Sequence, residues 1–163
     1  MDDNTSAGDA SGPGSGAVPV ASRTPLSEDE RRRIEARFAT IPLARALGVR
    51  MTRLERGECD LELADRRDLD GIFGSLHGGI LATLADSAVA FAMLTLLDPD
   101  AALATIEFNI RFLAPCRETV VAQSRVVRAG KTILTGTVDL VGRQSGTLFA
   151  TSGLTYMRLR PRT

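Results

Sequence analysis

The chain has 163 residues and balanced charge, with 20 Lys and Arg against 20 Asp and Glu, and 44% of its residues are hydrophobic. This length suits one globular domain with a core of its own. The absence of a basic excess argues against a dedicated nucleic-acid binder and against a peripheral membrane protein held by a basic face.

The first 26 residues differ in composition from the rest. Fifteen of them are Gly, Ala, Ser or Pro, without hydrophobic periodicity. Such a segment buries too little apolar surface to order itself, so we predict a disordered tail over residues 1–26 and one folded domain over 27–163. The acidic start lacks the features of a secretory signal, and the two cysteines, Cys59 and Cys116, form no metal-binding pattern. We therefore expect a cytoplasmic protein with reduced thiols.

Two stretches predict helices. Ser27 and Glu30 form a capping box at the start of residues 27–39. Residues 78–97 are almost entirely apolar, and Asp86 is their one charged side chain. A helix that is apolar on all sides is surrounded by protein or by lipid. The central acid and the absence of basic residues at both ends favour protein over membrane.

Runs of alternating polarity between glycine-containing turns predict six strands: 47–56, 58–64, 105–112, 117–128, 131–141 and 147–159. Short turns between the last four indicate an antiparallel meander. Unbroken alternation over residues 105–112 predicts that Thr105 and Phe108 lie on opposite faces. The economical architecture is an α+β fold in which the antiparallel sheet wraps around one long apolar helix.

The segment that enters the apolar helix carries candidate chemistry. His77 precedes Gly78 and Gly79 at the predicted helix start, where backbone N–H groups lack intrahelical acceptors and the helix dipole is positive. An acyl oxygen that develops negative charge could bind the Gly78 N–H, as in an oxyanion hole. The structural alternative is a tight turn in which His77 is only a polar residue at the start of the helix.

Asp86 is the second candidate. A carboxylate in an apolar helix costs free energy unless it is paired, hydrogen-bonded or protonated, and functional sites are where such costs occur. The alternative is an acid satisfied by Ser87 or by a neighbouring backbone group. Asp86 follows His77 by nine residues. On a helix this spacing places the two residues on opposite sides, about 13 Å apart along the helix axis. A site that uses both residues therefore requires two copies of the chain, as in a two-fold dimer with antiparallel helices.

These residues resemble those of a known family. The pattern L-H-G-G-x-x-x-x-L-x-D, from Leu76 to Asp86, resembles the signature of hotdog-fold acyl-CoA thioesterases of the phenylacetate-pathway type, and residues 106–115 resemble the family's following strand. The resemblance spans residues 40–160. It implies a hotdog fold, hydrolysis of acyl-CoA without a metal or redox cofactor, and a homodimer that assembles further into a homotetramer.

The resemblance also implies roles for single residues. Asp86 would act as general base on water or as nucleophile, a choice that the sequence leaves open. The Gly78 N–H would polarise the thioester carbonyl, His77 would fix that part of the site, and Gly79 would leave room for substrate. Thr105 would assist the water or the carboxylate, with a polar residue on a strand edge as the alternative.

Four further positions concern substrate binding. Members of the family usually carry Asn or Gln at the position of Gly71, and the adjacent Asp70 is only an acceptor when ionised. Arg128 and Lys131 flank a turn and are candidates for the phosphates of coenzyme A, with solvated hairpin charges as the alternative. The departure at Gly71 leaves a non-catalytic acyl-CoA-binding protein as one alternative function. A second alternative is a hotdog enoyl-CoA hydratase or dehydratase, because those enzymes also use a His and an acid, although in different motifs.

Overall fold

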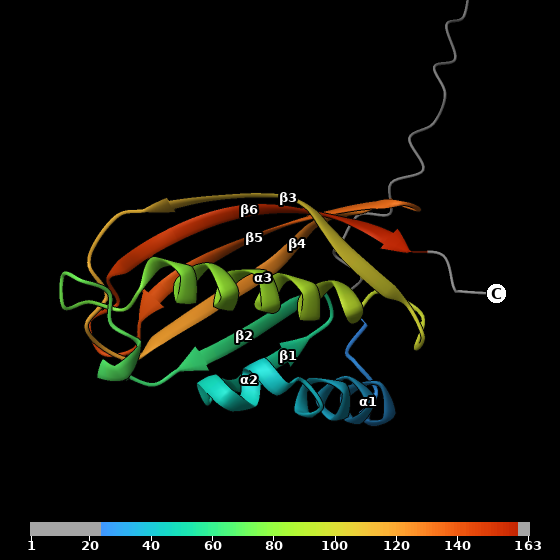
Figure 1. Ribbon diagram of the computed structural model, residues 1–163. Coiled ribbons are helices and arrows are strands. Elements are labelled where there is room, and N and C mark those ends of the chain that lie inside the picture. The colour runs from blue at the N-terminus through green and yellow to red at the C-terminus, as the bar shows by residue number, and fades with distance from the viewer. Residues whose placement is uncertain (1–23, 160–163) are drawn as a thin grey trace, which may run out of the picture.

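The computed structural model describes residues 24–159. In chain order they form α1 (Glu28–Ala39), α2 (Pro42–Leu47), β1 (Arg50–Glu55), β2 (Glu58–Leu63), the 3-10 turn η1 (Arg67–Leu69), α3 (Gly78–Leu94), β3 (Ala102–Phe112), β4 (Val120–Ala129), β5 (Ile133–Gly142) and β6 (Leu148–Leu159). Figure 1 shows α3 lying along one face of a single sheet, with α1 and α2 beside β1 and β2. The predicted tail falls outside the described residues except for residues 24–26, of which Leu26 packs against the core.

The N-terminal helices contain one confirmed prediction and one element that sequence analysis missed. The Glu30 N–H donates to Ser27 Oγ at 3.2 Å, and the Ser27 N–H donates to the Glu30 carboxylate at 2.8 Å, so the capping box is formed. Hydrogen bonds from the Ser27 N–H and from Arg56 lower the pKa of Glu30 to about 2. Helix α2 was not predicted, although Pro42 at its first position and Gly48 after its end are typical helix boundaries.

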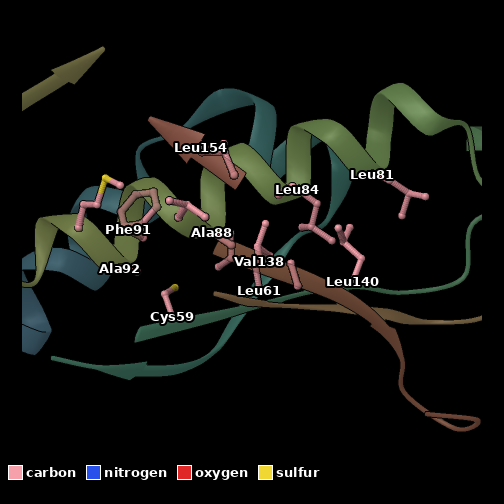
Figure 2. Packing of buried hydrophobic residues seen from close by; sticks show 14 of the residues in the cluster. Cys59, Leu61, Leu81, Leu84, Ala88, Phe91, Ala92, Val138, Leu140 and Leu154 are labelled. Atoms are coloured by element: carbon pink, nitrogen blue, oxygen red, sulfur yellow. The ribbon is translucent and has the colours of Figure 1, made fainter. Parts of the chain in front are cut away.

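Helix α3 forms the centre of the core. Its buried side chains face the sheet: Leu81, Leu84, Ala85, Ala88, Val89, Phe91, Ala92, Met93 and Leu94. Figure 2 shows several of them opposite Leu61, Val138, Leu140 and Leu154 of the strands. Gly136 of β5 allows this close approach, because a Cβ at that position would lie 2.6 Å from Val89 Cγ1. The predicted wrapping of a sheet around one apolar helix is confirmed.

The C-terminal end of α3 differs from the prediction. The helix ends at Leu94 rather than at residue 97. Thr95 ends it, because its hydroxyl donates to the Ala92 carbonyl at 2.6 Å and accepts the Gly57 N–H at 2.6 Å. No helix among the described residues has the length and hydrophobicity that a membrane span requires.

The sheet has the strand order β1-β2-β4-β5-β6-β3, and every neighbouring pair is antiparallel. The predicted meander is correct for β4, β5 and β6 and wrong for β3, which pairs with β6 instead of β4. Residues 113–119 join β3 to β4 and contain Pro115. This connection is longer than a hairpin turn, so it crosses the end of the sheet and leaves β3 at the edge.

A β-bulge at Ile106 changes the faces of β3. Thr105 pairs with Tyr156, whereas Phe108 pairs with Leu154, so the two strands differ by one residue over this interval. Tyr156 and Leu154 both face α3. The predicted unbroken alternation is therefore wrong, because Thr105 lies on the same face as Phe108 and points toward the helix.

Candidate active site

Asp86 is half-buried on α3 and contacts two strands. Its Oδ1 accepts a hydrogen bond from Thr105 Oγ1 of β3 at 2.9 Å and lies 2.6 Å from the Tyr156 hydroxyl of β6. The same hydroxyl lies 2.6 Å from the main-chain oxygen of Asp86. Within residues 24–159, Ser87 makes no hydrogen bond to this carboxylate, so the local alternative considered for Asp86 is not what the structure contains.

Tyr156 is the residue of this cluster that sequence analysis missed. It is the only tyrosine of the chain and is 2% exposed. Burial, together with the hydrogen bond to Asp86, raises the pKa of Tyr156, so its hydroxyl keeps its proton. The sequence signal that points to this residue is a single tyrosine in a strand that packs against a helix. Such a tyrosine is buried, and a buried phenol hydroxyl needs a hydrogen-bond partner.

At the start of α3, one backbone N–H donates to a capping side chain and another has no acceptor among the described residues. His77 Nδ1 accepts the Gly79 N–H at 2.9 Å, so the neutral ring carries its proton on Nε2. The Gly78 N–H has no acceptor among the described residues. The Phe112 ring covers Gly78, since a Cβ there would lie 3.1 Å from its Cζ. His77 thus serves as the helix cap, and the free donor belongs to Gly78.

Two grooves meet at this free donor. One, of about 370 Å³, lies between the helix start and the end of β3; its lining includes Leu76, Gly78, Leu81, Phe112 and Pro115. The other, of about 330 Å³, lies under the preceding loop; its lining includes Gly71, Ile72, Phe73, His77 and Gly78. Gly78 therefore lines both grooves.

The loop before α3 holds Asp70 and Gly71 in different settings. The Gly71 N–H donates to the Ser75 carbonyl at 2.8 Å, and a Cβ at Gly71 would lie 3.6 Å from His77 Cδ2, an ordinary contact distance. Asp70 pairs with Arg67, with 3.6 Å between Oδ2 and Nη1. Position 71 therefore adjoins His77 and has room for a side chain, whereas the Asp70 carboxylate is engaged with a base.

Arg128 and Lys131 lie apart from the acidic cluster of the same chain. Arg128 pairs with Thr135, whereas the next residue, Ala129, pairs with the buried Leu134, which faces α3. Arg128 therefore points away from α3. Lys131 is exposed in the turn between β4 and β5. Within one chain, neither basic side chain joins the candidate catalytic residues.

The cysteines and the other side chains that could bind a metal do not cluster in the described part of the chain. Cys59 and Cys116 are buried free thiols, and burial raises the pKa of both. Across residues 24–159, no three His, Cys, Asp or Glu side chains lie close enough together to bind a metal ion. Neither cysteine is therefore part of a metal site among the described residues.

A line of half-buried residues spaced by four runs along α3: Gly78, Ala82, Asp86 and Ala90. This spacing keeps them on one side of a helix. Gly78 and Asp86 are nevertheless eight residues apart, which is about 12 Å along the helix axis. We call these four residues the open stripe of α3.

Comparison with known proteins agrees with this geometry. The chain matches the family model of the Thioesterase superfamily over residues 73–148, which include Gly78, Asp86 and Thr105. A Thioesterase family protein from Silicibacter pomeroyi is 32% identical to this chain. The structural match covers 80% of this chain and 98% of that protein's chain, with a TM-score of 0.76. Acyl-coenzyme A thioesterase 13 of Homo sapiens is 28% identical over 130 residues, 78% of this chain and 92% of that protein.

The fold is also shared with a more distant protein. The PaaI protein of the E. coli phenylacetic acid degradation operon is 24% identical and covers 83% of this chain and 96% of its own, with a TM-score of 0.75. The expectation of a hotdog fold, an antiparallel sheet around a long central helix, is confirmed. The chain belongs to the Thioesterase superfamily and is a thioester hydrolase.

Proposed function

We propose that the chain hydrolyses acyl-CoA thioesters to the free acid and coenzyme A, in composite sites formed by two copies. The observation that carries this proposal is the open stripe, on which a hydrogen-bonded carboxylate and an unpaired N–H lie about 12 Å apart. Neither group alone activates a thioester, and one chain does not bring them together. The name of the human relative, acyl-coenzyme A thioesterase 13, supports coenzyme A as the leaving group.

A two-fold dimer with antiparallel α3 helices unites the two groups. If Gly78 of one copy lies level with Asp86 of the other, the axis passes Ala82, which is midway between them. The small residues of the stripe, among them Ala90, support close approach of a second helix. Each dimer then has two equivalent sites.

Strand β3 supports the same symmetry. Within residues 24–159 its outer edge has no partner strand, and Phe108 and Phe112 are 37% and 53% exposed. A long apolar edge is a template for pairing with another strand. Thr105 lies at the acidic end of the stripe and Phe112 at its glycine end, so an axis that exchanges these ends passes between Phe108 and Asn109.

In each site the thioester oxygen would accept the Gly78 N–H of one copy, while Asp86 of the other copy lies beside the carbonyl carbon. Attack by water that Asp86 deprotonates, or by the carboxylate itself, forms a tetrahedral intermediate. The N–H and the positive end of the helix dipole stabilise its oxyanion, and collapse expels the thiolate of coenzyme A. In the water route the thiolate takes the proton that Asp86 removed from the water. In the carboxylate route collapse leaves a mixed anhydride on Asp86, which a water then hydrolyses to the free acid and the regenerated carboxylate. Thr105 holds Asp86 Oδ1, and His77 holds the helix start.

The remaining substrate contacts are part of the same proposal. Gly79 and the loop with Asp70 and Gly71 would border the acyl and pantetheine portions. Arg128 and Lys131 would bind the phosphates of coenzyme A across a further subunit contact, in a homotetramer of two such dimers. The two free thiols support a cytoplasmic location, where thiols remain reduced.

The first test measures thiol release from a panel of acyl-CoAs by four variants. Asp86→Asn is expected to lower kcat/KM about 10³-fold without lowering the thermal midpoint. Gly78→Pro removes the donor and suits both the first position of the helix and the extended backbone of His77 (φ −59°, ψ 131°); it is expected to lower kcat about 100-fold. Gly78→Ala, which keeps the N–H and adds a Cβ against Phe112, and Ser87→Ala are the controls.

Each outcome addresses a separate part of the proposal. No thiol release by the wild type from any acyl-CoA would refute the activity, and hydration of an enoyl-CoA in the panel would identify a hydratase instead. Asp86→Asn with wild-type rates would refute the role of the carboxylate. Equal losses in Gly78→Pro and Gly78→Ala would assign the effect to the added atoms rather than to the missing donor.

A mixing experiment tests the composite site. Asp86→Asn and Gly78→Pro are each nearly inactive, yet a heterodimer of the two has one site with both groups intact. Random pairing of equal amounts would restore about a quarter of wild-type activity, because half of the dimers are mixed and each has one good site. If activity stays at the level of the single variants after subunit exchange, both groups act within one chain.

A further inference from the structure

The Tyr156 hydroxyl contacts Asp86 through two different atoms. It lies 2.6 Å from Asp86 Oδ1 and 2.6 Å from the Asp86 main-chain oxygen. Its ring is buried in β6, one strand in from the edge strand β3. A buried phenol hydroxyl needs a hydrogen-bond partner, and here that partner is the candidate catalytic carboxylate, whereas phenylalanine would fill the same volume without this contact.

The two hydroxyls around Asp86 leave its other carboxylate oxygen free. Thr105 Oγ1 donates to Oδ1 at 2.9 Å, and the protonated Tyr156 hydroxyl lies on the same atom. Among the described residues, no group makes a hydrogen bond to Oδ2. A carboxylate held through one oxygen by two donors has a defined rotation, and its second oxygen remains available to a water or a substrate carbon.

We propose that Tyr156 is a positioning residue for Asp86: it fixes the carboxylate through Oδ1 and directs Oδ2 to the substrate. This inference rests on the proposed hydrolysis at Asp86. It differs from the role of Thr105 because Thr105 lies on the exposed edge strand, whereas Tyr156 approaches from inside the sheet and also contacts the backbone of α3. The buried hydroxyl therefore ties the reactive group to the rigid centre of the fold.

The direct test is Tyr156→Phe, which keeps the ring and removes the hydroxyl. We expect kcat to fall about 10- to 100-fold, as for loss of a hydrogen bond to a charged group, with KM changed less than about twofold. A fall in kcat at nearly constant KM indicates a misplaced carboxylate rather than weaker substrate binding. In the Asp86→Asn background, the same substitution has no further effect on the residual rate.

Ser152→Ala is the matched control. Ser152 also lies in β6 and is buried, and its hydroxyl donates to the Asn109 carbonyl at 2.7 Å rather than to Asp86. This variant is expected to keep the wild-type kcat and KM even if its thermal midpoint falls. Equal effects of the two variants on kcat, or a wild-type kcat in Tyr156→Phe, would overturn the positioning role.

The single tyrosine permits a second test that needs no mutation at Tyr156. Growth on 3-fluorotyrosine labels only this position, so one fluorine resonance reports on its hydroxyl. Its chemical shift is expected to change in Asp86→Asn and to stay at the wild-type value in Ser152→Ala. A wild-type chemical shift in Asp86→Asn would refute the contact. A wild type without thioesterase activity would refute the proposed function instead, since the fluorine shift concerns the contact alone.

Discussion

The buried side of helix α3 and its open stripe differ in the contacts that they make within the chain. On the buried side, residues such as Leu84 and Ala88 are enclosed by the sheet and make all their contacts within one chain (Figure 2). On the open stripe, Gly78 offers an N–H without an acceptor, and Asp86 offers one unbonded oxygen among the described residues. The comparison teaches that one helix can separate the two tasks: its buried side stabilises the fold, and the open stripe carries the groups of the proposed composite site.

The largest expected effect is that of Ala82→Arg, which changes the open stripe and leaves the buried side of α3 intact. This variant places two bulky cations at the proposed two-fold axis, so association and activity should both fall by at least about 100-fold while the secondary structure is kept. Analytical ultracentrifugation and thiol release measure the two effects. Ala46→Arg, at an exposed alanine of α2, is the matched control. A dimer with full activity in Ala82→Arg would place the subunit contact elsewhere.

The second-largest effect is expected on stability, from a substitution on the buried side of α3. Leu84 is 2% exposed, and Leu84→Ala is expected to lower the free energy of unfolding by about 3–5 kcal/mol through lost burial and a residual cavity. Activity per folded molecule should stay close to that of the wild type. Urea unfolding with parallel assays measures both quantities, with the exposed Leu43→Ala as control. Loss of activity in fully folded Leu84→Ala would contradict the division between the two sides.

The smallest expected effect restores a donor next to the open stripe. Gly71→Asn puts an amide beside His77, where a Cβ meets only ordinary contacts, and kcat/KM should rise about three- to tenfold. Gly74→Asn, in the same loop with open space around its Cβ, should leave the rate unchanged. If both variants keep the wild-type rate, an amide at position 71 contributes nothing to this enzyme.

Much of the fold was predictable because its signals are local. The capping box at Ser27 needs only neighbouring residues, and the apolar run with Asp86 marks the central helix in any arrangement of the strands. The acid and the His-Gly pair were identified for the same reason, since their residue types and spacing are visible in the sequence. The position of β3 was not predictable in this way, because a long connection leaves its partner strand undetermined.

The sequence by itself determined the candidate residues for the chemistry: Asp86, His77 and the glycine pair. Only the tertiary structure decided which groups surround Asp86. The bulge at Ile106 turned Thr105 toward the helix, and the pairing of β3 with β6 brought Tyr156 to the same carboxylate oxygen. The physical reason is that periodicity reports only which side of its own element a residue occupies. Strand pairing and a one-residue shift of register depend on contacts between residues distant in the chain.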